Sequence, residues 1–155
     1  MLFLAADHAG FELKEKIKAY LSKHQIPFKD TGAFEFDKDD DYPDFAHAAA
    51  LEVSKNPERN RAILICGSGA GMSITANKVK TVYCAQVWQR DLARGAREHN
   101  NVNAIALGAR YISEEEAILS VAEFLKTEGK TEERHERRFR KIQQIEGNRP
   151  QLTPP

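Results

Sequence analysis

Short apolar runs alternate with amphipathic stretches along nearly the whole chain, and this alternation constrains the fold more than any other feature. The apolar runs occupy residues 2–6, 26–29, 62–66, 82–87 and 104–107. Apolar residues at helical spacing predict helices at 11–24, from 43 onward, 72–78, 88–98, after the Ser113 capping box and from 131 to about 146. Continuous apolar strands separated by helices are typical of a parallel sheet covered on both faces. We therefore expect an α/β fold, a three-layer α/β/α sandwich with a five-stranded parallel sheet whose strand order is left open.

Length, charge and cysteine usage exclude several classes of protein. A chain of 155 residues is one domain by size; we place the domain at 1–146 and expect the Pro-rich polar segment 147–155 to be a disordered tail. Lys plus Arg (23) balances Asp plus Glu (23), so no global field favours nucleic acid or an acidic membrane. No apolar run approaches the roughly 20 residues of a membrane span, and no signal peptide is evident. Two cysteines inside apolar runs suit reduced thiols, so we expect a cytoplasmic protein.

Three segments follow predicted strands at the edge of the sheet where ligands bind. In open parallel sheets that edge is the carboxyl end of the strands. The segments are 7–10, 66–71 and 108–110. We expect functional side chains there before anywhere else. Asp7 and His8 belong to the first segment, although Asp7 alone could equally cap a helix.

The segment 66–71 combines a cysteine with three glycines. Gly67, Gly69 and Gly71 leave backbone N–H groups free at a helix N-terminus, which favours a bound anion over a plain strand–turn–helix junction. The pattern is neither a Walker loop nor a dinucleotide fingerprint. Met72 stands where a tyrosine phosphatase loop needs arginine, which excludes that class. The helix N-terminus would stabilise a thiolate at Cys66, whereas the second cysteine, Cys84, is interpreted as a buried small hydrophobe.

The predicted last helix is rich in basic residues. A solvated charged face is the usual explanation, but Arg134 and Arg138 continue an apolar stripe, and paired guanidinium groups match a phosphate. Interleaved glutamates make nucleic acid an improbable partner. His99 and Asn100 end a helix before the fifth strand, at the edge opposite the expected crevice. They are therefore either structural or part of a neighbouring subunit's site.

Seven short motifs appear in the order seen in the type B ribose-5-phosphate isomerase family, which includes allose- and galactose-6-phosphate isomerases. The motifs are DHAGF (7–11), DYP (41–43), ICGSGAG (65–71), ANK (76–78), HN (99–100), LGAR (107–110) and RHERR (134–138). The chain resembles this family over about residues 1–146. The resemblance implies a metal-free and cofactor-free aldose–ketose isomerase on a Rossmann-like sandwich. It further implies a homodimer with sites shared between subunits, and leaves open whether dimers pair into tetramers.

The resemblance also implies a role for each candidate residue. Cys66 would move a proton between C2 and C1, and Ser68 with the turn N–H groups of Gly67, Gly69, Ala70 and Gly71 would stabilise the enediolate oxygen. His99 of the partner subunit would assist opening of the sugar ring. The expected sugar contacts are Asp7, His8, Tyr42 and Asn100. The expected phosphate contacts are Arg110, Arg134 and Arg138, with His135 nearby and His8 as a further candidate.

Three positions depart from the family pattern. Ser68 stands where many relatives have Thr, Tyr83 where Arg is frequent, and Trp88 where smaller residues are usual. These changes bear on the substrate more than on the reaction. The leading hypothesis is interconversion of ribose 5-phosphate and ribulose 5-phosphate. The alternatives are an isomerase of a six-carbon sugar phosphate and a non-catalytic sugar-phosphate-binding module.

Overall fold

Five strands form a single sheet in the order β2-β1-β3-β5-β4, and every pairing is parallel. The computed structural model describes residues 1–129 and 132–147. The strands are β1 (Leu2–Ala6), β2 (Phe28–Asp30), β3 (Arg61–Cys66), β4 (Cys84–Val87) and β5 (Ala104–Gly108). The predicted five-stranded parallel sheet is thereby confirmed. Its order places β1, β3 and β5 side by side, so the segments that follow these strands share one edge.

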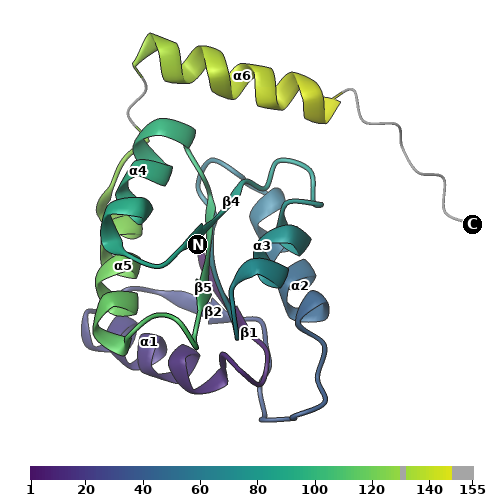
Figure 1. Ribbon diagram of the computed structural model, residues 1–155, viewed down its shortest axis with the longest axis vertical. Coiled ribbons are helices and arrows are strands. Elements are labelled where there is room, and N and C mark those ends of the chain that lie inside the picture. The colour runs from purple at the N-terminus through teal and green to yellow at the C-terminus, as the bar shows by residue number, and fades with distance from the viewer. Residues whose placement is uncertain (130–131, 148–155) are drawn as a thin grey trace, which may run out of the picture.

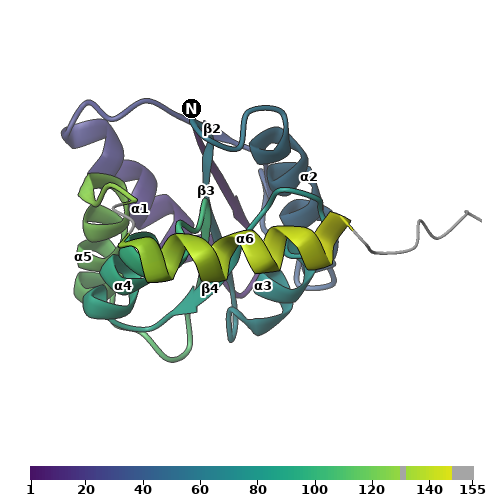
Figure 2. The same cartoon turned by 90° about the horizontal axis from the view of Figure 1, so that it is seen from above.

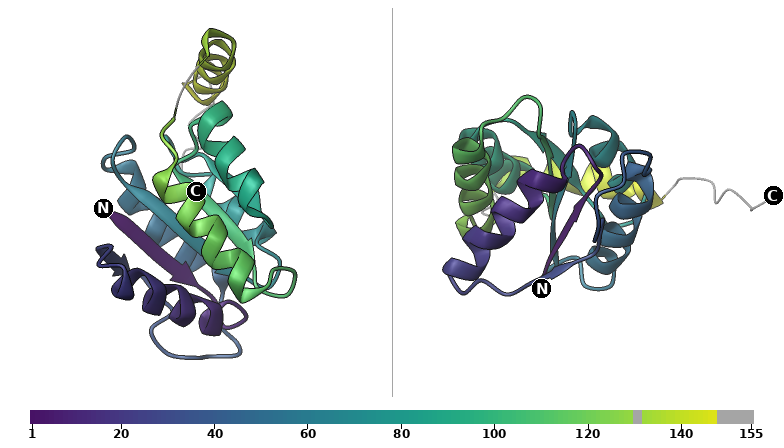
Figure 3. Two further views of the ribbon diagram at one scale, coloured as in Figure 1. Left: turned by 90° about the vertical axis from the view of Figure 1, so that its left-hand side faces the viewer. Right: turned by 90° about the horizontal axis from the view of Figure 1, so that it is seen from below.

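Helices cover both faces of the sheet and complete the predicted three layers (Figure 1). The helices are α1 (Phe11–Lys23), α2 (Tyr42–Ser54), α3 (Ala70–Ala76), α4 (Arg90–Asn100), α5 (Glu114–Lys126) and α6 (Glu133–Gly147). One face packs against α1, α4 and α5 and the other against α2 and α3, because successive residues of each strand point to opposite faces. The left panel of Figure 3 shows α1 and α5 next to each other on the first of these faces. Within the described residues, no helix is long and apolar enough to span a membrane.

Several boundaries differ from the sequence prediction. The second strand begins at Phe28, not Ile26, because Gln25 adopts a positive φ of 57° and delays the entry into the sheet. The third helix begins at Ala70, directly after the left-handed Gly69, and not at residue 72. Ser113 accepts a hydrogen bond from the Glu116 backbone N–H at 3.2 Å, which confirms the predicted cap. The predicted cap of the last helix at 131 and the tail beyond 147 lie outside the described residues.

Helix α6 lies across the amino edge of the sheet, outside the three layers. Figure 2 shows it running over that edge from the side of α4 to the side of α3. Glu146 accepts hydrogen bonds from the Thr81 backbone N–H (2.9 Å) and the Tyr83 hydroxyl (2.8 Å), just before β4. The Tyr83 ring also meets the Phe139 ring edge-on, with centroids 4.8 Å apart. None of the 15 residues of α6 is buried, so this helix packs on the rest of the chain through a narrow strip.

Candidate functional site

The carboxyl edge of the sheet brings the three predicted segments together. The backbone N–H of Asp7 donates to the Ile65 carbonyl at 3.2 Å. Across the next pair of strands, Ala109 donates to the Cys66 carbonyl at 2.9 Å and Arg110 to the Gly67 carbonyl at 3.1 Å. The ends of β1, β3 and β5 thus form one continuous hydrogen-bonded surface.

The glycine turn delivers a backbone donor to the cysteine sulfur. Gly69 has a φ of 80°, and its N–H donates to Cys66 Sγ at 3.1 Å. A side chain at Gly69 would approach the backbone of Leu107 to 3.0 Å, so both the conformation and the space require glycine. An N–H group directed at the sulfur stabilises negative charge there. The turn therefore suits a cysteine that acts as a base or nucleophile.

The second cysteine has a different environment. Cys84 lies at the start of β4, and burial raises the pKa of its thiol to about 12. Its Sγ lies 4.0 Å from the Ala85 carbonyl oxygen. Both cysteines are free. The interpretation of Cys84 as a small buried hydrophobe is confirmed.

Two side chains flank the turn in the space that its glycines leave open. A Cβ atom at Gly67 would lie 3.1 Å from the guanidinium carbon of Arg110. A Cβ atom at Gly71 would lie 2.5 Å from the ring of Tyr42. The turn is therefore bordered by a cation on one side and a phenol on the other. Either glycine replaced by a larger residue would displace its neighbour.

Ser68 faces a hollow on the surface. Its hydroxyl accepts a hydrogen bond from the Ala70 N–H at 3.3 Å, and its side of the turn is exposed. The hollow has a volume of about 460 Å³ and is lined by Ser68, Gln86, Val87, Trp88, Gly108 and Tyr111. Trp88, singled out in the sequence as unusually large, thus stands at the rim beside Ser68. Gln86, which the sequence did not indicate, donates to the Ser68 carbonyl at 2.7 Å.

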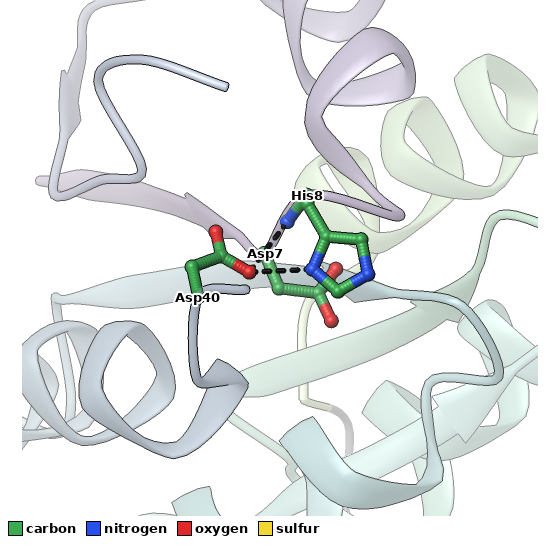
Figure 4. Close-up of side chains that lie close together, drawn as sticks. All are labelled: Asp7, His8 and Asp40. Atoms are coloured by element: carbon green, nitrogen blue, oxygen red, sulfur yellow. Dashed lines mark hydrogen bonds and ion pairs between the residues drawn. The ribbon is translucent and has the colours of Figure 1, made fainter. Parts of the chain in front are cut away.

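Asp7 and His8 meet a third residue, Asp40, that the sequence analysis did not select (Figure 4). Asp40 Oδ1 lies 2.6 Å from His8 Nδ1 and accepts the His8 backbone N–H at 3.0 Å. The hydrogen bond with Asp40 raises the pKa of His8, and burial raises the pKa of Asp7. One atom of each residue that could bind a metal ion (a carboxylate oxygen or a ring nitrogen) lies within 4.8 Å of the other two. The internal hydrogen bonds already explain this proximity, and we assign no metal ion to it.

The remaining predicted residues lie at the opposite, amino edge. The His99 and His135 rings stack with centroids 4.6 Å apart, joining the end of α4 to α6. Burial and the neighbouring His99 lower the pKa of His135. Arg134 forms a 2.7 Å ion pair with Glu132 and remains largely exposed. Asn100 and Arg138 are exposed as well.

Within one chain, the candidate residues therefore form two separate groups. The group at the carboxyl edge comprises Asp7, His8, Tyr42, Cys66, Gly67, Ser68, Gly69, Ala70, Gly71 and Arg110. The group at the amino edge comprises His99, Asn100, Arg134, His135 and Arg138. Figure 1 shows the separation: α6 borders one end of the sheet, and the loop entering α2 borders the other. The first group alone holds a cysteine sulfur, backbone N–H donors and one arginine.

Comparison with known proteins identifies the family of the chain. Residues 2–142 match the model of the Ribose/Galactose Isomerase family. The chain is 43% identical over 143 residues to the probable ribose-5-phosphate isomerase B of Mycoplasma genitalium, covering 91% of this chain and 92% of that protein. It is 43% identical over 138 residues to ribose-5-phosphate isomerase B of Mycolicibacterium paratuberculosis, covering 89% and 86%.

A solved structure gives the same result. The crystal structure of the M. genitalium enzyme with bound ribulose-5-phosphate superimposes with a TM-score of 0.92 at 41% identity, covering 96% of this chain and 97% of that one. Both sequence and fold are thus shared over nearly the full length. The chain belongs to the ribose/galactose isomerase family and is an aldose–ketose isomerase.

Proposed function

We propose that the protein interconverts D-ribose 5-phosphate and D-ribulose 5-phosphate through an enediolate, with Cys66 as the proton-transferring base. The observation that carries the proposal is the 3.1 Å hydrogen bond from the Gly69 N–H to Cys66 Sγ beside the guanidinium group of Arg110. A base, oxyanion donors and a cation for the substrate phosphate then occupy one edge. The relative solved with ribulose-5-phosphate supports this sugar.

The chemistry divides between the sulfur and the turn. The Cys66 thiolate removes the C2 proton of the open-chain aldose, and the electron pair forms the C1–C2 double bond while negative charge passes to O1. The thiol then returns the proton to C1, as a proton moves from O2 to O1. Ser68 and the turn N–H groups stabilise the oxyanion, which is commonly the largest contribution, and the base adds about 10²–10⁴ in rate. Arg110 binds the phosphate, which orients the sugar.

A second copy of the chain would complete the site. His99, Asn100, Arg134, His135 and Arg138 lie at the amino edge, so in this proposal they act at the carboxyl edge of a partner subunit in a homodimer. There His99 opens the furanose ring, Asn100 contacts the sugar, and the arginines with His135 bind the phosphate. The two free thiols suit a reducing compartment such as the cytoplasm.

Proton NMR in D₂O tests the reaction directly. We expect ribose 5-phosphate to form ketose with deuterium entering the sugar, and allose 6-phosphate, run in parallel, to react more slowly. Faster reaction of the six-carbon sugar would reassign the substrate. Cys66→Ala should bind sugar phosphate but lose turnover by about 10²-fold or more, while Cys84→Ala, a matched control in the core, should retain it. Equal turnover in both variants would remove Cys66 as the base.

Mixing two inactive variants tests the shared site. Cys66→Ala and His99→Ala proteins, combined under conditions that permit subunit exchange, should regain activity because mixed dimers contain one site with both groups intact. Exchange is verified independently with differently tagged subunits. No recovery despite verified exchange would show that each chain uses its own His99.

A further inference from the structure

Asp40 is the sheltered member of the acidic loop at 37–41. Its side chain is 7% exposed, whereas that of the adjacent Asp39 is 79% exposed. A buried carboxylate is costly unless hydrogen bonds or charges compensate it. Within the described residues, its Oδ2 is buried without a hydrogen-bond partner, and its Oδ1 interacts with His8 alone. In the part of the chain that the structure describes, His8 is therefore the side-chain partner that compensates the burial of the Asp40 carboxylate.

The two contacts with Oδ1 fix both the backbone and the ring of His8. The backbone N–H at 3.0 Å holds the residue at the end of β1, and Nδ1 at 2.6 Å fixes the rotation of the imidazole. A histidine bonded to a carboxylate through Nδ1 carries a proton there, so in the imidazolium form the Nε2–H is left to donate to a ligand. Figure 4 shows Nε2 on the side of the ring away from Asp40.

Three charged groups face the imidazole, each from a different segment. Asp40 belongs to the loop before α2, Asp7 to the end of β1, and Arg110 to the loop after β5. The two carboxylates favour the imidazolium and Arg110 opposes it, and the pKa of His8 is raised overall, chiefly by Asp40. Protonated His8 and Arg110 would thus place two positive charges at the carboxyl edge.

We propose that Asp40 is a positioning residue: it holds the protonated His8 ring so that its Nε2–H, together with Arg110, donates to the phosphate of the substrate. This inference rests on the proposed function for the identity of the phosphorylated ligand. Asp40 contacts no substrate atom in this scheme and acts only through His8. Loss of the Asp40 charge should therefore change phosphate binding and leave the proton transfer at Cys66 intact.

NMR titration of the His8 ring tests the proposal, with inorganic phosphate as the probe. His8→Gln identifies the resonance, and Asp39→Asn, an exposed neighbour in the same loop, is the matched control. In Asp40→Asn we expect the pKa of His8 to fall, phosphate affinity at pH 7 to drop about tenfold because hydrogen bonds to charged groups are the stronger class, and KM to rise while kcat changes little. Asp39→Asn should match the wild type in all three. An unchanged His8 titration, or unchanged phosphate affinity, in Asp40→Asn would overturn the proposal.

Two further measurements separate positioning from general structural support. In the His8→Gln background, Asp40→Asn should add no further loss of phosphate affinity; an equal loss in both backgrounds would show that Asp40 does not act through His8. In the wild type, nitrogen-15 spectra of neutral His8 should show the proton on Nδ1, and a proton on Nε2 would contradict the scheme. This measurement needs no substituted protein. These readouts use inorganic phosphate, so they remain valid if no isomerisation of ribose 5-phosphate is found in D₂O.

Discussion

Replacing Gly71 with alanine would place a methyl group against the ring of Tyr42. The added Cβ would lie 2.5 Å from Cε2 and 2.6 Å from Cζ of that ring, too close for both to stay in place. The backbone of Gly71 is held in place by helix α3, whereas Tyr42 is at the first position of α2 and 39% exposed. The ring will therefore rotate toward solvent, away from the glycine turn.

The effects on stability nearly cancel, and the effect on catalysis does not. Alanine gains up to about 1 kcal/mol over glycine inside a helix, while a displaced side chain costs about 0.5–1.5 kcal/mol. We therefore expect the free energy of unfolding to change by less than about 1 kcal/mol. If the Tyr42 hydroxyl binds the sugar, its lost hydrogen bond is worth about 0.5–1.5 kcal/mol, or about a two- to twelvefold decrease in kcat/KM.

Urea unfolding and steady-state kinetics measure the two effects separately. Gly95→Ala is the matched control for stability, because it also removes a helical glycine but its Cβ would meet only the His99 ring, at 3.7 Å. The difference between the two variants in unfolding free energy isolates the cost of moving Tyr42. Gly71→Ala combined with Tyr42→Phe should be no less active than Tyr42→Phe alone. Unchanged kcat/KM in folded Gly71→Ala would refute a role for Tyr42 in the site.

Three further predictions concern charge, anchoring and thiol reactivity. Burial raises the pKa of Asp7. Burial is also the largest single effect on Asp30, but the hydrogen bonds from Lys14, Lys18 and the Gly32 N–H, with the Lys14 charge, together lower its pKa. In urea unfolding from pH 7 to 3, Asp7→Asn should be more stable than the wild type at pH 7, and this difference should shrink as the pH falls and be gone below the ordinary pKa of 3.8. Asp30→Asn should be less stable than the wild type at pH 7, and this difference should shrink only as the pH falls below 3.8. Stability differences of the same sign in the two variants at pH 7 would contradict this prediction. Tyr83→Phe removes the 2.8 Å bond that anchors α6, so amide hydrogen exchange should accelerate in α6 and not in the sheet. In Cys66→Ala protein, the remaining Cys84 should resist thiol reagents at pH 8 until the chain unfolds, because its pKa is about 12.

The parts of the fold that follow from local pattern could be predicted from the sequence. Apolar runs such as 62–66 identify buried strands because a strand covered on both faces needs no polar side. The order of the strands could not be predicted in this way, since it depends on which crossovers skip a neighbour. Boundaries moved where one residue adopts an unusual conformation: Gln25 delays β2, and Gly69 starts α3 early.

The candidate site shows the same division. The glycine turn with Cys66 has a recognisable local sequence, so its residues could be selected before the fold was known. Asp40 could not be selected, because in a run of four aspartates and a lysine at 37–41 each carboxylate has the same local appearance. Only the return of the loop past the end of β1 shelters Asp40 and pairs it with His8. A buried acid in an otherwise solvated run is visible only once long-range contacts are known.

The separation of the two residue groups has a consequence for assembly. If the amino edge of one subunit completes the carboxyl edge of another, two-fold symmetry requires the reciprocal contact, and both sites of the dimer are completed together. A head-to-tail contact would instead leave one unfilled edge at each end of an open chain. Helix α6 fits the reciprocal arrangement, because it buries none of its 15 residues in a single chain and yet presents Ile142 and Ile145 to solvent at 42% and 66% exposure. In the proposed dimer, a partner subunit would cover these two isoleucines while its substrate binds the neighbouring Arg138.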